Sequence, residues 1–223
     1  SFLFHTAGVI ILARLLTPRD FGLVAMVSAF SMLPLNFGFN GFTEYIIQKK
    51  SISMQEINSI FWMHLFIAII LFILFVIFGF YLVSFYSEPA LSGIAAALST
   101  GFIFAALYTT PRAILKRDMK FKSLAIGDLS AGIVSIIVAI LVAMGGLSYW
   151  AVVIRQVLLS LVHMIVAWLL CRWRPQRPKF ISTAIPALKY AIKVYCNFTL
   201  GYLTRNIDKI LLGKFHGSTV LGN

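Results

Sequence analysis

Seven long apolar stretches, separated by short polar gaps, account for most of the chain. They cover residues 2–16, 21–47, 60–83, 91–111, 124–144, 149–171 and 194–212. A helix needs about 20 apolar residues to cross roughly 30 Å of hydrocarbon, and every stretch except the first is near or above that length. The pattern therefore predicts seven membrane-spanning helices, and we interpret the first as a helix whose beginning is missing.

The alternative membrane architecture is a β-barrel, whose strands show segments of about 10 residues that alternate in polarity. Residues 67–80 are instead an almost unbroken run of Ile, Leu, Phe and Val. In lipid such a run must satisfy its own backbone hydrogen bonds, which a helix does within itself. The expected fold class is all-α, a polytopic membrane helix bundle.

Composition excludes the soluble and disordered classes. Of 223 residues, 60% are hydrophobic and 12% are charged, with a mean hydropathy of +0.93, whereas an ordinary soluble domain is about 25% charged. The net charge of +12 would suggest nucleic acid in a soluble chain. Because the basic residues lie mostly between apolar stretches, we expect membrane lipids and no nucleic acid as partners.

Basic residues occupy alternate gaps. The gaps after the second, fourth and sixth stretches hold thirteen of them: Lys49, Lys50, Arg112, Lys116, Arg117, Lys120, Lys122, Arg172, Arg174, Arg177, Lys179, Lys189 and Lys193. The remaining gaps hold only Arg14 and Arg19. Since Lys and Arg are retained on the cytoplasmic side, this pattern predicts that these three gaps and the N-terminus are cytoplasmic.

A weak internal repeat has an offset of 200 residues: residues 11–15 (Ile-Leu-Ala-Arg-Leu) match residues 211–215 (Leu-Leu-Gly-Lys-Phe), and 21–22 match 221–222. Short matches between hydrophobic segments also arise by chance, but the six-helix period and the charge pattern agree with this one. We therefore expect residues 1–180 to form a first six-helix bundle. Residues 181–223 would be the inter-bundle connection and the first helix of a second bundle.

Three segments carry a resemblance to a known family: residues 11–22 (Ile-Leu-Ala-Arg-Leu-Leu-Thr-Pro-Arg-Asp-Phe-Gly), 115–122 and 205–213. They resemble the polysaccharide flippases of the MOP exporter superfamily. The resemblance implies a bacterial inner (plasma) membrane protein that translocates undecaprenyl-diphosphate-linked sugar repeat units for O-antigen, colanic-acid and exopolysaccharide synthesis. Members have twelve or fourteen helices in two bundles, which implies an N-terminal fragment whose partner is the missing C-terminal half.

Polar residues inside three apolar stretches form one-sided stripes. They are Asn36, Asn40 and Glu44; Arg155, Gln156, Ser160 and His163; and Asn197, Gly201, Arg205 and Asp208. Such stripes face a bundle interior or a water-filled cavity, because an ionisable group in lipid costs about 2.5–3.5 kcal/mol. The predicted substrate-binding residues are Arg205, Arg155, Asp208, Asn36, Asn40, Gln156 and His163. Guanidinium groups match the oxygens of a diphosphate.

Structural roles for the same residues stay open. Arg205 can pair with Asp208 one turn along the helix, and Arg155 can extend to the outer surface from about 10 Å deep. His163 can be a packing hydrogen-bonder or a proton carrier. Asp128 can be a solvated or paired end charge, or a cation-coupling group.

No catalytic constellation, metal-ligand spacing or nucleotide-binding motif occurs, so we expect neither an enzyme nor a cofactor. The sequence predicts a lipid-linked oligosaccharide translocase that works by alternating access through a cationic cavity. The alternative is a multidrug or cation-coupled exporter of the same superfamily, for which Glu44 is the only acidic residue within the first two stretches. A polymer ligase or polymerase would need a catalytic platform, and the outer gaps are too short for one.

Overall fold

The computed structural model describes residues 11–12, 14–176 and 184–222, with the backbone alone at 37–40, 203 and 206–222. This part of the chain contains six long helices and no strand: α2 (Pro18–Gln48), α3 (Met54–Tyr86), α4 (Ala90–Arg117), α5 (Phe121–Met144), α6 (Trp150–Leu170) and α7 (Ile185–Gly222). The all-α prediction is confirmed.

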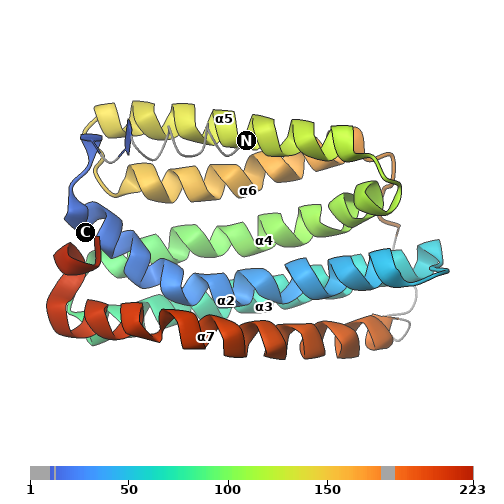
Figure 1. Cartoon of the computed structure of the whole chain (residues 1–223), viewed down its shortest axis with the longest axis horizontal. Helices are drawn as coiled ribbons and strands as arrows, with labels where there is room; N and C mark the ends of the chain where they lie inside the picture. Colours follow the sequence, from blue (N-terminus) through green and yellow to red (C-terminus); the bar gives the residue numbers. More distant parts are fainter. Residues whose placement is uncertain (1–10, 13, 177–183, 223) are drawn as a thin grey trace.

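The helices lie along one common axis, and successive helices run in opposite directions (Figure 1). α5 packs on α6, α6 on α4, α4 on α2, and α2 on α7, while α3 packs mainly on α4. α2 and α7 are therefore neighbours although most of the chain separates them in sequence.

Five helices, α2 to α6, are long and apolar enough to cross a membrane. They match the second to sixth predicted spans. The largest differences are that α3 begins six residues before the predicted start at residue 60, and that α4 ends six residues after the predicted end at residue 111. The seventh predicted span lies within α7, which is a helix but is not among these five. Most of the first predicted span lies outside the described residues. The chain is thus a multi-pass membrane protein.

The C-terminal ends of α2, α4 and α6 lie at one end of the bundle (Figure 1). We call it the basic end, because the three predicted gaps that follow these spans hold thirteen of the nineteen Lys and Arg residues of the sequence. The connections after α3 and α5 meet at the opposite end and hold no Lys or Arg. This segregation is what the alternate-gap pattern predicts for an alternating helix topology.

The segment that carries the strongest family resemblance is the start of α2. Thr17 is the N-cap, Pro18 occupies the first turn, and Asp20 completes a capping box. The Asp20 carboxylate accepts hydrogen bonds from the Thr17 backbone N–H at 2.9 Å and the Thr17 hydroxyl at 2.7 Å, and also from the Ser148 hydroxyl. Because Ser148 belongs to the α5–α6 connection, a local helix cap also joins two distant parts of the bundle.

At the basic end, Arg117 caps the other terminus of α2. Its guanidinium donates to the carbonyl oxygens of Ile46, of Lys49 at 2.7 Å and of Lys50 at 3.1 Å. The last carbonyls of a helix lack intrahelical donors and carry partial negative charge. A guanidinium at this position supplies both hydrogen-bond donors and a positive charge. Beside it, the bond from Lys49 Nζ to Glu56 (2.6 Å) raises the pKa of the Lys49 amine.

Replacing Arg117 with alanine is expected to destabilise the folded protein by about 1–3 kcal/mol, because several carbonyls at the end of α2 lose a charged donor. Thermal unfolding in detergent micelles measures the change. Lys116→Ala is the matched control, since Lys116 is exposed and precedes Arg117 on the same helix. Equal melting temperatures for the two variants would contradict the capping role.

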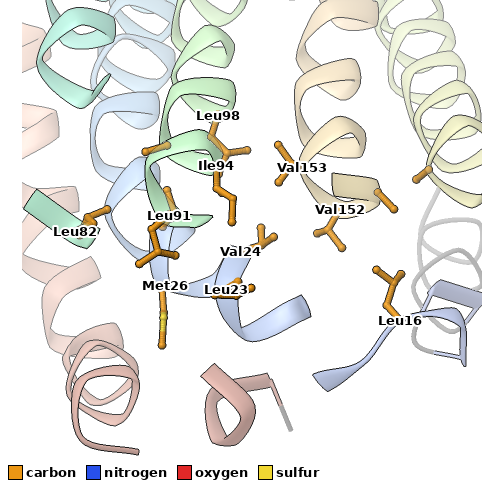
Figure 2. Close-up of a cluster of buried hydrophobic side chains, with 14 of the residues drawn as sticks. Leu16, Leu23, Val24, Met26, Leu82, Leu91, Ile94, Leu98, Val152 and Val153 are labelled. Carbon is orange, nitrogen blue, oxygen red and sulfur yellow. The ribbon is translucent and has the colours of Figure 1, made fainter. Parts of the chain in front are cut away.

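The larger of two buried apolar clusters lies towards the opposite end (Figure 2). Residues of α2, α3, α4 and α6 meet there, with Val27, Leu91, Ile94 and Val153 fully buried. The second cluster lies towards the basic end and joins α2, α3 and α4 to Ala187 and Ala191 of α7 and to Ala184, which directly precedes α7. Small residues at these positions let two helix backbones approach closely.

Candidate functional site

A pocket lies between α2, α4 and α6, and we call it the mid-bundle pocket. Its wall is mostly apolar and carries three polar side chains, those of Ser31, Gln156 and Ser160. It has about 320 Å³ of empty space and is lined by Ser31, Met32, Leu35, Leu98, Gly101, Phe102, Gln156, Val157 and Ser160. Gly101 and Ser160 are 11 and 10 positions beyond the first residues of their helices. At 1.5 Å per residue this places the pocket about 15 Å from the opposite end, near the middle of the hydrocarbon layer.

Gln156 provides the main polar group of the mid-bundle pocket. Its Nε2 atom lies 3.5 Å from the Ser28 hydroxyl of α2. A hydrogen bond of this length is weak, so the amide can exchange it for a ligand or water. Gln156 was one of the predicted binding residues, and it does line a cavity at mid-depth.

Arg155 immediately precedes Gln156 and is half-buried. It lies about 8 Å from the start of α6, and among the described residues no carboxylate oxygen is within 4 Å of its guanidinium. A cation inside a membrane span without a carboxylate partner needs water, a backbone carbonyl or an anionic ligand.

The remaining predicted residues are distributed as follows. Asn36 is half-buried, one turn beyond Met32 of the pocket, and its Nδ2 atom donates to the Met32 carbonyl oxygen at 2.8 Å. Arg205 is exposed on α7. The side chains of Asn40 and Asp208 lie outside the described part, and so does any Arg205–Asp208 pair.

His163 lies in a different pocket from Gln156 and Ser160. We call it the α4–α5–α6 pocket; it has about 250 Å³ of empty space and is lined by Tyr108, Arg112, Leu115, Ser123, Leu124, Gly127, His163, Val166, Ala167 and Leu170. The single polar stripe predicted on α6 is thus divided, because Gln156 and Ser160 line one cavity and His163 lines another nearer the basic end.

An ion-pair cluster joins the three helices at this second pocket. Arg112 donates from Nη1 and Nη2 to the two carboxylate oxygens of Asp128, at 2.7 and 3.2 Å. His163 Nε2 lies 3.1 Å from Asp128 Oδ1, and its ring centroid is 5.6 Å from that of Tyr108. The side chains of Arg112, Asp128 and His163 are 23%, 41% and 17% exposed.

Sequence reasoning did not find this cluster. The sequence favoured a topological role for Arg112, with some attraction for anionic headgroups, and for Asp128 either a solvated or paired end charge or a cation-coupling group. It named no partner for either residue. The available signal was symmetry: the two residues are at similar distances from the short connection at residues 118–120. Two oppositely charged residues at equal distances from the connection between two antiparallel helices lie at the same height along the bundle axis, where they can pair.

Within the described residues, no group of three or more His, Cys, Asp or Glu side chains could hold a metal ion.

Comparisons with known proteins give one consistent group of relatives. The family model described as "Polysaccharide biosynthesis protein" matches residues 11–223. The chain is similar to the lipopolysaccharide biosynthesis protein WzxC of Escherichia coli K12, with 21% identity over 95% of this chain and 44% of that protein. It is also similar to the succinoglycan biosynthesis transport protein ExoT of Rhizobium meliloti, with 20% identity over 95% of this chain and 43% of that protein.

The teichuronic acid biosynthesis protein TuaB of Bacillus subtilis is 24% identical over 87% of this chain and 40% of its own length. The chain thus spans less than half of each of these three relatives. No solved structure matches.

Proposed function

The chain belongs to the polysaccharide biosynthesis protein family, and on this premise we propose that it is the first half of a transporter for lipid-linked sugar repeat units. The substrate would be an undecaprenyl-diphosphate-linked oligosaccharide, carried outward across the bacterial inner membrane by alternating access. Two observations carry the proposal. The mid-bundle pocket holds the polar side chains of Ser31, Gln156 and Ser160. Arg155, which precedes Gln156 on α6 but does not line the pocket, has no carboxylate oxygen within 4 Å among the described residues.

The side chains at this depth suit such a headgroup. In this proposal the guanidinium of Arg155, outside the pocket lining, pairs with diphosphate oxygens. The Gln156 amide and the Ser31 and Ser160 hydroxyls of the pocket suit sugar hydroxyls. In this proposal Asn36, Asn40, Arg205, Asp208 and His163 complete the polar path, the second bundle supplies the other cavity wall, and the basic end is cytoplasmic. In a cell that is negative inside, each negative charge carried outward gains about 2.3 kcal/mol per 100 mV.

The test uses the full-length protein in a strain that lacks it. Arg155→Ala is expected to slow polymer export about tenfold, the equivalent of one lost charge-assisted contact, while membrane insertion persists. Arg155→Lys should retain part of the activity, because it keeps the charge without the planar fork. Lys189→Ala, an exposed basic residue on α7, is the control.

Arg205→Ala is expected to abolish complementation of polymer export while the protein still inserts. Accumulation of the lipid-linked precursor, measured in the same cells, separates failed translocation from failed synthesis. Full export by both the Arg155→Ala and Arg205→Ala variants would overturn the cationic-cavity proposal.

A further inference from the structure

We propose that the α4–α5–α6 pocket is a second binding site, which takes the phosphate group of an anionic lipid at the basic end. Arg112 is its ligand, and Asp128 is a resident counter-ion that the phosphate replaces. The site is separate from the mid-bundle pocket. The phosphate has two candidate sources, the diphosphate of the lipid-linked transport substrate and the headgroup of a membrane phospholipid. Only the first of these rests on the proposed function.

The lining of the pocket combines hydrogen-bond donors with an apolar wall. Its polar side chains are Tyr108, Arg112, Ser123 and His163, each of which can donate a hydrogen bond. The rest of the lining is apolar, consisting of Leu115, Leu124, Gly127, Val166, Ala167 and Leu170. A lipid presents the complementary pair of surfaces, an anionic phosphate joined to a hydrocarbon chain.

The depth of the cluster also suits a lipid phosphate. Arg112 is five residues from the end of α4, and Asp128 is seven from the start of α5, which places them about 8 and 10 Å from the helix ends. These helices have 28 and 24 residues, so they extend a few ångströms beyond about 30 Å of hydrocarbon. The backbone positions of Arg112 and Asp128 therefore lie roughly 2–8 Å inside the hydrocarbon edge.

The geometry of the ion pair allows exchange. Arg112 donates to Asp128 from Nη1 and Nη2. The same pair of N–H groups can donate to two phosphate oxygens. The Asp128 side chain is 41% exposed, so protein atoms do not enclose the carboxylate on every side. Lys116 and Lys122 are exposed nearby in the sequence and add attraction for an anionic headgroup, at about 1 kcal/mol each.

The 250 Å³ of non-atom space beside Arg112 is partly open to the surroundings, and its enclosed part has room for no more than about one water molecule. A phosphate group would therefore enter from the open side and take the place of the Asp128 carboxylate at the guanidinium. A phosphate in place of the carboxylate keeps two parallel hydrogen bonds at the guanidinium, while the side-chain link from α4 to α5 is lost in the bound state.

The experiment measures lipid binding to the purified full-length protein in detergent micelles by native mass spectrometry. The probes are farnesyl diphosphate, dioctanoyl phosphatidylglycerol and, as a zwitterionic reference, dioctanoyl phosphatidylcholine. Arg112→Ala is expected to weaken binding of at least one anionic probe about tenfold or more, and Arg112→Lys less. Lys189→Ala controls for the loss of one positive charge at the basic end.

Asp128→Asn gives the decisive readout. Removing the competing charge is expected to tighten binding of the same probe severalfold, whereas a purely structural pair would only lose stability. Arg112-dependent binding of farnesyl diphosphate identifies the transport substrate as the phosphate source, and such binding of phosphatidylglycerol alone identifies a membrane phospholipid. Unchanged binding in both Arg112 variants, or unchanged or weaker binding in Asp128→Asn, would overturn the site. These outcomes do not depend on the export assay for Arg155, so the two proposals fail separately.

Discussion

A leucine in place of Gly41 is expected to abolish polymer export and to destabilise the folded protein by about 3 kcal/mol or more. Gly41 lies where α2 crosses α7, and a Cβ atom there would be 2.5 Å from the Ala191 Cα atom and 2.7 Å from its Cβ atom. The obstructing group is backbone, so it cannot turn aside as the tip of a side chain can. The two helices must separate to admit any side chain.

The separation would also break contacts on either side of the crossing. The Tyr190 hydroxyl lies 3.0 Å from Gln48 Oε1, and the Tyr202 hydroxyl donates to the Ala29 carbonyl oxygen at 3.0 Å. Thermal unfolding in micelles and complementation of export measure the two effects. Gly132→Leu is the control, because nothing lies within 4 Å of a Cβ atom built at Gly132. A Gly41→Leu variant as stable as the control would show that α2 and α7 do not pack in this way in the full-length protein.

Asp20→Ala is expected to cost about 2–4 kcal/mol, combining the loss of a helix cap with the loss of charged hydrogen bonds to Ser148 and the nearby backbone. Asp20 is buried, and its carboxylate holds the start of α2 to the α5–α6 connection. Ser148→Ala removes one partner and should cost about 1–2 kcal/mol.

Chemical unfolding of the two single variants and the double variant separates the contributions of the cap and the connection. If the bond to Ser148 matters, the double variant should be no less stable than Asp20→Ala alone. An Asp20→Ala variant with unchanged stability would contradict the proposed role of Asp20 in capping α2 and holding it to the α5–α6 connection.

Two of the three family-like segments, residues 11–22 and 115–122, thus have roles at the helix ends. Arg19 pairs with Glu88 at 3.1 Å, Asp20 joins α2 to the α5–α6 connection, and Arg117 caps the far end of α2. The sequence identified these segments by resemblance and could not assign their roles, because each partner is at least 67 residues away in the chain.

Part of the candidate site could be predicted from the sequence. Gln156 was predicted from its place in a polar stripe, since a charged or amide side chain in a membrane helix must face a protein interior or water. The stripe could not reveal that its members divide between two pockets, because that depends on where α2, α4 and α5 cross α6. Arg205, the strongest sequence candidate, is exposed on α7, and its role remains a prediction.

The amino-acid sequence by itself determined the helical class, the spans now seen as α2 to α6 and the gathering of basic residues at one end, because these follow from apolar run length and the cost of charge in lipid. Only the tertiary structure decided that α7 lies against α2, that Arg112 meets Asp128 and His163, and that two separate cavities form. Lipid surrounds every span alike, so hydrophobicity cannot select neighbours; close packing of small residues and paired polar groups does.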